Sequence, residues 1–273
     1  MGRARAAGLE WMPMSSPVAT LARRATAGPA QGFAVWSAAW LAGSAGTDEL
    51  LAALGEWAPV QSVVDGDVPD LLAEIRALEP HTVRLLLPAP GDARGLPAGT
   101  DLEQAAMARG ELVLFDGATS TIALVPTPEA GDVMRWQAFL HEPALVDPDP
   151  ISLGAAEHAL RDAVREAPSA LASLPPAPDA ASDPRGVVME LTRYLGAHRL
   201  PRGATERAHR VLDSAGMVEA ILLVAGTENP YAGLTLASAQ GGDAAYRDLW
   251  RTVRAARVAA VNAVCRDELR GAF

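Results

Sequence analysis

The chain has 273 residues, of which 49% are apolar and 21% are charged, the composition of a folded globular protein of one or two domains. Its net charge of −10 argues against the positive surface that nucleic-acid phosphates require, so we expect no nucleic-acid partner. The single cysteine, Cys265, excludes an intrachain disulfide framework and a thiolate metal cluster, and it fits a reducing cytosol.

All 23 basic residues are arginine, so the chain contains no lysine. This excludes mechanisms that need a lysine amine, such as a Schiff base or a phosphate-loop lysine. Guanidinium groups pair with carboxylates in a bidentate geometry, which favours ion-paired surfaces and interfaces. Neither a phosphate-loop motif nor a dinucleotide fingerprint is present, and we expect no cofactor.

The first 28 residues combine arginines with Gly, Pro and Ser, which predicts a largely disordered arm, at least up to Ser16. The apolar run Phe33–Ala42 follows and places Trp36 and Trp40 four residues apart, on one face of a helix. The basic residues before this run and the small residues after it also resemble a secretory signal, but the two indoles favour a buried core helix. The run is shorter than the roughly 20 apolar residues that span a bilayer, so we expect a cytoplasmic protein without a membrane element.

Residues 29–148 are expected to form an α/β (or α+β) domain around a small mixed sheet. The apolar run Leu112–Phe115 lacks alternation, as in a central strand covered on both faces, and Asp116-Gly117 predicts a hairpin after it. The other expected strands are Val60–Val64, Val83–Leu87, Thr121–Val125 and Met134–Leu140. The expected helices are Asp48–Trp57, with Thr47 as its N-cap, Asp67–Leu78 and Asp101–Arg109.

Residues 149–273 are expected to form an all-α helical bundle. The proline-rich segment 141–150 predicts the domain boundary, and a second linker is expected over 174–184. Apolar residues at spacings of three and four predict four helices, with Pro168 as a break or kink in the first. The expected spans are 153–174, 184–198, 205–226 and 243–266.

Three segments of the chain resemble a family of conserved hypothetical proteins from high-GC actinobacteria. They are the run Leu87–Leu96, the strand end Leu124-Val125-Pro126, and the helical run Leu153–Glu166. The resemblance extends over most of Phe33–Glu268. It implies the architecture and a bacterial cytoplasmic setting, and it carries over no catalytic residue.

The loop Pro88–Pro97 is the sharpest candidate site, because ligands commonly bind in loops that leave the carboxyl end of a strand. Its glycines, Gly91 and Gly95, either only turn the chain or allow a ligand to approach the backbone closely. In the second case, backbone N–H groups with Arg84 or Arg94 would bind an anion or carboxylate, and Asp92 is a candidate acid–base group.

One cluster offers plausible metal ligands. Its members are His141, Glu142, Asp147, Asp149, Glu157, His158 and Asp162. Because no tight ligand motif is present and Glu157 with Arg161 makes an ordinary surface pair, we expect no metal.

Glu219 interrupts the otherwise apolar segment Met217–Gly226. A buried carboxylate there would have a raised pKa and would be a candidate acid or base. The alternative is a half-exposed carboxylate at the edge of the apolar stripe that pairs with an arginine of a neighbouring helix.

These patterns leave the function open between two classes. We expect a non-catalytic cytoplasmic binding or protein-interaction protein, with a small anionic ligand or a homodimer or protein partner bound through the helical domain. The alternative is a small-molecule enzyme that acts on an anionic substrate at the Pro88–Pro97 loop and the domain junction.

Overall fold

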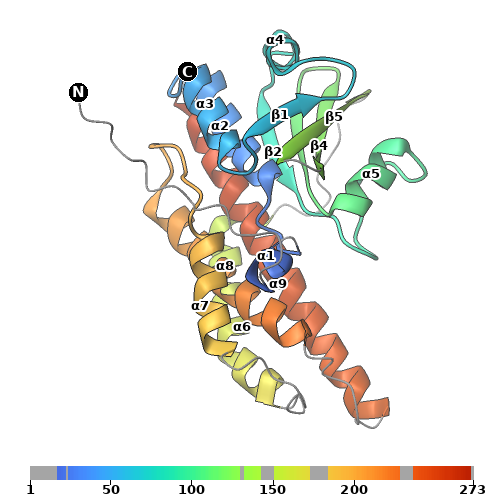
Figure 1. Ribbon diagram of the computed structural model, residues 1–273, viewed down its shortest axis with the longest axis vertical. Helices are drawn as coiled ribbons and strands as arrows, with labels where there is room; N and C mark the ends of the chain where they lie inside the picture. The colour runs from blue at the N-terminus through green and yellow to red at the C-terminus, as the bar shows by residue number, and fades with distance from the viewer. Residues whose placement is uncertain are drawn as a thin grey trace.

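The computed structural model describes residues 17–22, 24–129, 132–142, 151–172, 184–227 and 236–271. Figure 1 shows a sheet with its covering helices at one end of the molecule and a helical bundle at the other, and one long helix, α9, runs along both. All five strands lie between residues 60 and 141, and four helices follow residue 152. The expected fold class, a small mixed sheet followed by a helical bundle, is confirmed, whereas the division at residue 148 stays a prediction.

The sheet has the strand order β1-β5-β4-β3-β2. Strands β2 to β5 form an antiparallel meander, and β1 pairs with β5 in parallel, so the sheet is mixed. The predicted hairpin joins β3 to β4, with Asp116 opposite Thr121. Strand β3 lies inside the sheet and all its residues are buried, but β4 is the middle strand. The strands are β1 (Val60–Val63), β2 (Thr82–Leu86), β3 (Leu112–Asp116), β4 (Thr121–Glu129) and β5 (Val133–His141).

The sheet is covered on both faces, which explains the apolar run without alternation in β3. One face carries Phe115 and Trp136, which make edge-to-face contacts with Phe33 of α2 at centroid distances of 5.9 and 4.7 Å. The other face packs against Leu102 and Ala106 of α5 (Asp101–Arg109). The core therefore lies mainly between the sheet and the helices α2 and α9.

Helix α9 also closes the free edge of β2. The Asn262 side chain accepts a hydrogen bond from Leu85 N at 2.7 Å and donates one to Leu85 O at 3.3 Å. An unpaired strand edge otherwise offers its backbone groups to another chain. This contact also fixes the position of α9 relative to the sheet.

Helix α2 (Pro29–Leu41) contains the tryptophan-bearing run, and twelve of its thirteen residues are buried. None of the helices in the described part of the chain is long and apolar enough to cross a membrane. Helix α3 (Thr47–Gly55) begins one residue earlier than expected, with Gly46 as its N-cap. At this end Gly46 N donates to Glu49 Oε2 at 2.8 Å, and the Thr47 hydroxyl instead accepts a hydrogen bond from Trp40 Nε1 at 3.1 Å. Helix α4 (Val68–Ala77) begins at the expected cap, Asp67.

The sequence predicts disorder at least up to Ser16, and part of the segment after it forms regular structure. Residues Pro17–Ala22 form helix α1, and Val18, Leu21 and Ala27 are buried. These side chains pack on Leu191 and Leu195 of α7, a tertiary contact that local composition does not predict. Residues 1–16 lie outside the described part of the chain.

The bundle consists of α6 (Leu153–Ala172), α7 (Pro184–Leu195), α8 (Glu206–Thr227) and α9 (Leu236–Arg270). Helix α6 passes through Pro168 without a break, contrary to expectation. Helix α9 has 35 residues and packs against α6 and α8 at one end and α2 and β2 at the other. Both expected linkers lie outside the described residues, apart from His141, Glu142 and Pro184, which begins α7.

Candidate functional site

The first half of the Pro88–Pro97 loop is a tight turn. Ala89 and Asp92 exchange two backbone hydrogen bonds of 2.9 and 2.7 Å around Pro90 and Gly91. Gly91 has φ +82°, a conformation that favours glycine, and a proline before it is typical of a type II turn. Gly91 is therefore required to turn the chain at this point.

The second half of the loop is another turn, in which Leu96 N donates to Ala93 O at 3.1 Å. Its two central residues, Arg94 and Gly95, are both left-handed, with φ of 53° and 76°. Arginine rarely adopts this conformation, so the backbone of Arg94 is locally strained in this turn. The turn keeps the Arg94 side chain largely buried, with 13% of its surface exposed.

The loop and α9 bring two guanidinium groups to one carboxylate. Asp92 Oδ2 lies 3.9 Å from Arg94 Nε, beyond hydrogen-bond distance. Arg254 of α9 is partly buried beside the same loop. Burial lowers the pKa of Arg254, and the Asp92 carboxylate partly offsets this effect. Within the described part of the chain Arg254 forms no ion pair, so neither guanidinium group is closely paired.

A second group of charges lies behind this site, at the centre of the molecule. Arg257 of α9 donates to Glu219 of α8 at 2.5 Å, to Gln31 of α2 at 3.0 Å and to Thr26 at 3.2 Å. The backbone N–H of Thr26 donates to the other carboxylate oxygen of Glu219. The Arg257 and Glu219 side chains are 1% and 0% exposed.

This network determines the role of Glu219. The carboxylate pairs with an arginine of a neighbouring helix, as one of the two alternatives expected, but it is completely buried rather than half-exposed. Both of its oxygens already accept hydrogen bonds. The network joins α2, α8 and α9, so it fixes the junction between the sheet and the bundle.

Glu111, just before β3, is a buried carboxyl group that the sequence does not single out. Its Oε2 accepts a hydrogen bond of 3.0 Å from Ala30 N, at the start of α2, where the helix dipole favours a carboxylate. The Glu111 carboxyl group fits here because Gly28 has no side chain, and a Cβ at that position would overlap the carboxyl group. Burial raises the pKa of Glu111 to about 7, although the Ala30 N–H group and the charges of Arg109 and Arg257 act in the opposite direction.

Arg84 does not join the loop site. It forms a bidentate pair with Asp116, with N–O distances of 2.6 and 3.1 Å, and Thr121 donates to the same carboxylate at 2.9 Å. Asp116 lies opposite Thr82, at the end of β2 remote from the loop. The structure thus brings together Asp92 and Arg94 of the predicted set, adds Arg254, and assigns Arg84 to the sheet.

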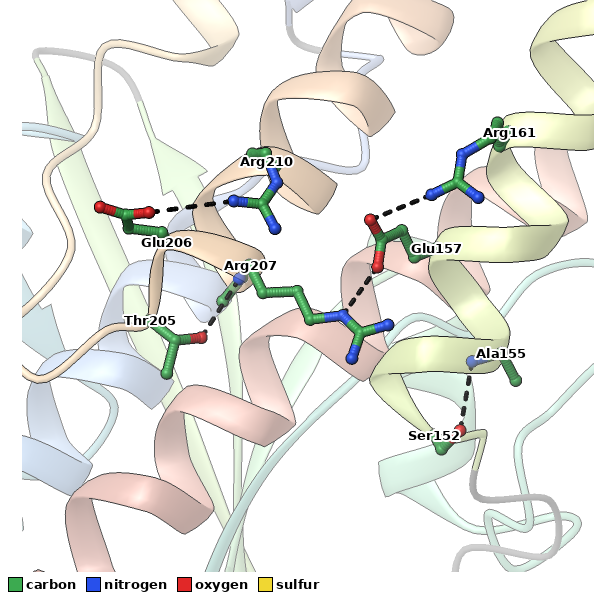
Figure 2. A network of polar contacts seen from close by, with 9 residues as sticks. Ser152, Ala155, Glu157, Arg161, Thr205, Glu206, Arg207 and Arg210 are labelled. Carbon is green, nitrogen blue, oxygen red and sulfur yellow. Dashed lines mark hydrogen bonds and ion pairs between the residues drawn. The ribbon is translucent and has the colours of Figure 1, made fainter.

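Of the candidate metal ligands, Asp147 and Asp149 lie outside the described residues, and His158 pairs with Asp162 at 3.2 Å. Among the residues that the structure describes, no group of three or more His, Cys, Asp or Glu side chains could hold a metal ion. Figure 2 shows Glu157 of α6 between two arginines, Arg161 of the same helix at 3.1 Å and Arg207 of α8 at 2.7 Å. These arginines lower the pKa of Glu157, with the Arg207 hydrogen bond as the largest cause. Glu157 therefore links α6 to α8 as an ion pair.

Among the residues that the structure describes, His198, which follows α7, has a buried side chain without a hydrogen bond. Its ring stacks on Trp57 at a centroid distance of 3.5 Å, and neither ring nitrogen has a hydrogen-bond partner. Its Nδ1 lies 3.9 Å from Glu56, whose carboxylate is paired with Arg199 at 2.6 Å. Burial, and to a smaller extent the charge of Arg257, lowers the pKa of His198 to about 4.

The sequence contains a weak signal for the residues that were missed. Arg257 and Asn262 interrupt the apolar stretch 255–265, as Glu219 interrupts its own helix. Two opposite charges in two apolar helices predict a buried pair, because each alone would be strongly unfavourable. Glu111 stands just before an apolar strand and His198 just after a helix, where the sequence alone does not show burial, and the tertiary packing buries them.

The architecture defines a class of protein in which a small five-stranded sheet and a helical bundle share a buried ionic junction. The chain matches the models for the N-terminal domain of Rv1486c-like proteins over residues 30–150 and for their C-terminal domain over residues 154–258. It belongs to this Rv1486c-like family, and the expected actinobacterial resemblance is confirmed. The search of solved structures gives no match.

Two mycobacterial relatives show how far the similarity extends. The chain is 36% identical to the uncharacterized protein Rv1486c of Mycobacterium tuberculosis strain H37Rv, over 86% of this chain and 96% of that protein. It is 34% identical to the uncharacterized protein ML1804 of Mycobacterium leprae, over 86% of this chain and 97% of that protein. These names state no activity, so the family match leaves the ligand open.

Proposed function

We propose that the protein is a non-catalytic binding protein whose ligand presents a small anionic group to the Pro88–Pro97 loop and α9. The observation that carries the proposal is that Arg94 lies 3.9 Å from the Asp92 carboxylate without a hydrogen bond to it, while Arg254 of α9 is close enough for the charges of both residues to act on it. Two guanidinium groups can hold a phosphate or a carboxylate through several charge-assisted hydrogen bonds. The N–H groups of Ala89, Asp92 and Leu96 already close the two turns, and Arg94 N donates to Asp92 Oδ1 at 3.3 Å, so the guanidinium groups carry the contact with the anion.

The charge of the whole chain makes a local site necessary. At a net charge of −10 the surface as a whole repels anions, so affinity has to come from short-range contacts. Partial burial of Arg94 and Arg254 strengthens these contacts because fewer water molecules screen them. Asp92 then acts as an internal competitor that an incoming anion displaces.

Two of the side chains that could serve catalysis are occupied or inaccessible in the structure. The Glu219 carboxylate forms a buried ion pair with Arg257. Cys265 is also buried, and burial raises the pKa of its thiol well above the usual range. The enzyme alternative has one observation in its favour, the pKa of Glu111 near 7, which suits acid–base chemistry. That carboxyl group is enclosed by Gly28 and the start of α2, so a substrate reaches it only if this segment moves.

We also propose that the protein acts in the cytoplasm with α2 retained. The helix is buried in the main core, and cleavage after the apolar run would remove Phe33 from its contacts with the sheet. Mass spectrometry of the native protein tests this point. A mature N-terminus near Gly46 would show that the run is a signal.

The anion site is tested by thermal shift with inorganic phosphate, pyrophosphate and citrate at constant ionic strength. We expect at least one of these anions to raise the melting temperature of the wild type and to have no such effect on Arg94→Ala or Arg254→Ala. Arg135→Ala is the matched control, because Arg135 is an exposed arginine on β5 paired with Glu129 at 3.0 Å. If no anion stabilises the wild type, or if all three variants respond equally, the proposal is wrong.

A further inference from the structure

Helices α7 and α8 form an outer layer of the bundle with two uncovered apolar side chains. The inner side of α7 packs on α8 and α1, through Leu191 and Leu195. On the outside, Met189 of α7 is 71% exposed and Met217 of α8 is 52% exposed. Methionine is flexible and polarisable, and exposed methionines are common on surfaces that bind other proteins.

A small cavity of about 220 Å³ lies directly beside Met217. Two glycines without side chains leave this space open: Gly196, just after α7, and Gly216 of α8. The two helices are close together here, since a Cβ on Gly216 would lie 3.7 Å from the Cβ of Leu195. The cavity is lined by Thr192, Gly196, Leu212, Asp213, Ser214, Gly216 and Met217. It therefore offers a mostly apolar space for one side chain of methionine size.

A projecting side chain next to a cavity that fits it is the arrangement required for association of identical chains. In a two-fold dimer each copy supplies the same surface, so the surface must be complementary to itself. Met217 and the cavity lie on the same face, and two copies that face one another can exchange them. A different partner would have to supply its own apolar side chain for the cavity and a cover for Met217.

The charges on this face also favour a second copy. Apart from the buried Glu219 and from Arg207, which pairs with Glu157 of α6, the two helices carry three arginines and three carboxylates. The chain as a whole has a net charge of −10, so the rest of its surface carries the excess of negative charge. Two identical acidic proteins repel one another least where their surfaces are locally balanced.

We infer that two copies of the chain associate through the α7–α8 face, with Met217 of each inserted into the α7–α8 cavity of the other. This inference is independent of the anion site, because no residue of the loop site lines the cavity. The contact buries the Met217 side chain, which is half exposed in the single chain. The two-fold symmetry repeats the contact, so a dimer contains it twice. Because the face is small, the dimer is expected to dissociate on dilution.

Sedimentation velocity of the full chain over a wide range of concentration tests the inference. The wild type should show a concentration-dependent monomer–dimer equilibrium. Met217→Glu should raise the dissociation constant at least about tenfold, because it places a charge in an apolar cavity. Gly196→Met should have the same effect by filling the cavity from within its own chain.

Leu140→Glu is the matched control, since Leu140 is an exposed apolar residue on β5 and the substitution changes the net charge equally. This variant should dimerise like the wild type, and circular dichroism of each variant should show retained folding. A wild type that is monomeric at every concentration would overturn the inference. A dimer that survives Met217→Glu, or that is broken by Leu140→Glu, would also overturn it, because the interface would then lie elsewhere.

Discussion

The two buried titratable groups Glu111 and His198 should make the stability of the protein respond to pH in opposite directions. In the folded chain the pKa of Glu111 is about 7, against its ordinary value of 4.5. Between these values the folded state holds a proton that the unfolded state has lost, so stability falls as the pH rises from 4.5 to 7. At about 1.4 kcal/mol per pKa unit, the full effect is about 3 kcal/mol.

His198 has the opposite sign. Its pKa in the folded chain is about 4, against the ordinary value of 6.5. Between these values the unfolded state binds a proton that the folded state excludes, so stability falls as the pH drops from 6.5 to 4, again by about 3 kcal/mol. In the wild type the two effects largely cancel where their ranges overlap.

The substitution Glu111→Gln separates the two effects. The amide oxygen can still accept the hydrogen bond from Ala30 N, but it carries no charge at any pH. The free energy of unfolding of the variant, relative to the wild type, should therefore rise by about 3 kcal/mol between pH 4.5 and pH 8. Its own profile should fall on acidification below pH 6.5, where only the His198 effect remains.

Urea unfolding followed by tryptophan fluorescence at a series of pH values measures this difference. Glu74→Gln on the exposed face of α4 serves as the control and should reproduce the wild-type profile. A difference between Glu111→Gln and the wild type that stays constant from pH 4.5 to pH 8 would refute the argument. It would mean that the carboxyl group is more accessible to solvent than its packing indicates.

Three further predictions follow from individual contacts. Gly28→Ala should destabilise the protein by about 1 to 3 kcal/mol in urea unfolding, because the new methyl group overlaps the Glu111 carboxyl group, and an unchanged stability would contradict this packing. Asn262→Leu should cost about 2 kcal/mol or more in the same assay, since it leaves two backbone groups of β2 buried and unpaired, and a cost below about 0.5 kcal/mol would show that water replaces the side chain. Asp92→Asn should tighten anion binding by isothermal titration calorimetry, because it removes the internal competitor; weaker binding would assign Asp92 a positioning role instead.

The elements with strong local signals could be predicted from the sequence. The hairpin between β3 and β4 follows from Asp116-Gly117 between two apolar runs, and the start of α4 follows from the Asp67 cap. The position of α2 in the core follows from its apolar run with Trp36 and Trp40. In each case neighbours in the sequence decide the conformation.

Features that depend on distant residues could not be predicted. Thr47 has the right chemistry for a cap, but its hydroxyl group instead accepts a hydrogen bond from the indole of Trp40. Helix α1 is stabilised by α7, which is more than 150 residues away in the chain. Arg94 and Asp92 could be predicted from the loop sequence. Arg254 could not, because only the fold brings this residue of α9 within reach of their charges.

The most direct test of the anion site is an NMR titration of the wild type with inorganic phosphate, observed at the Nε–H groups of arginine. We predict that the signals of Arg94 and Arg254 move together and saturate with one dissociation constant, while the signal of Arg135 moves only with ionic strength. If all exposed arginines shift in parallel without saturation, phosphate acts only as a screening ion, and the proposed site does not exist.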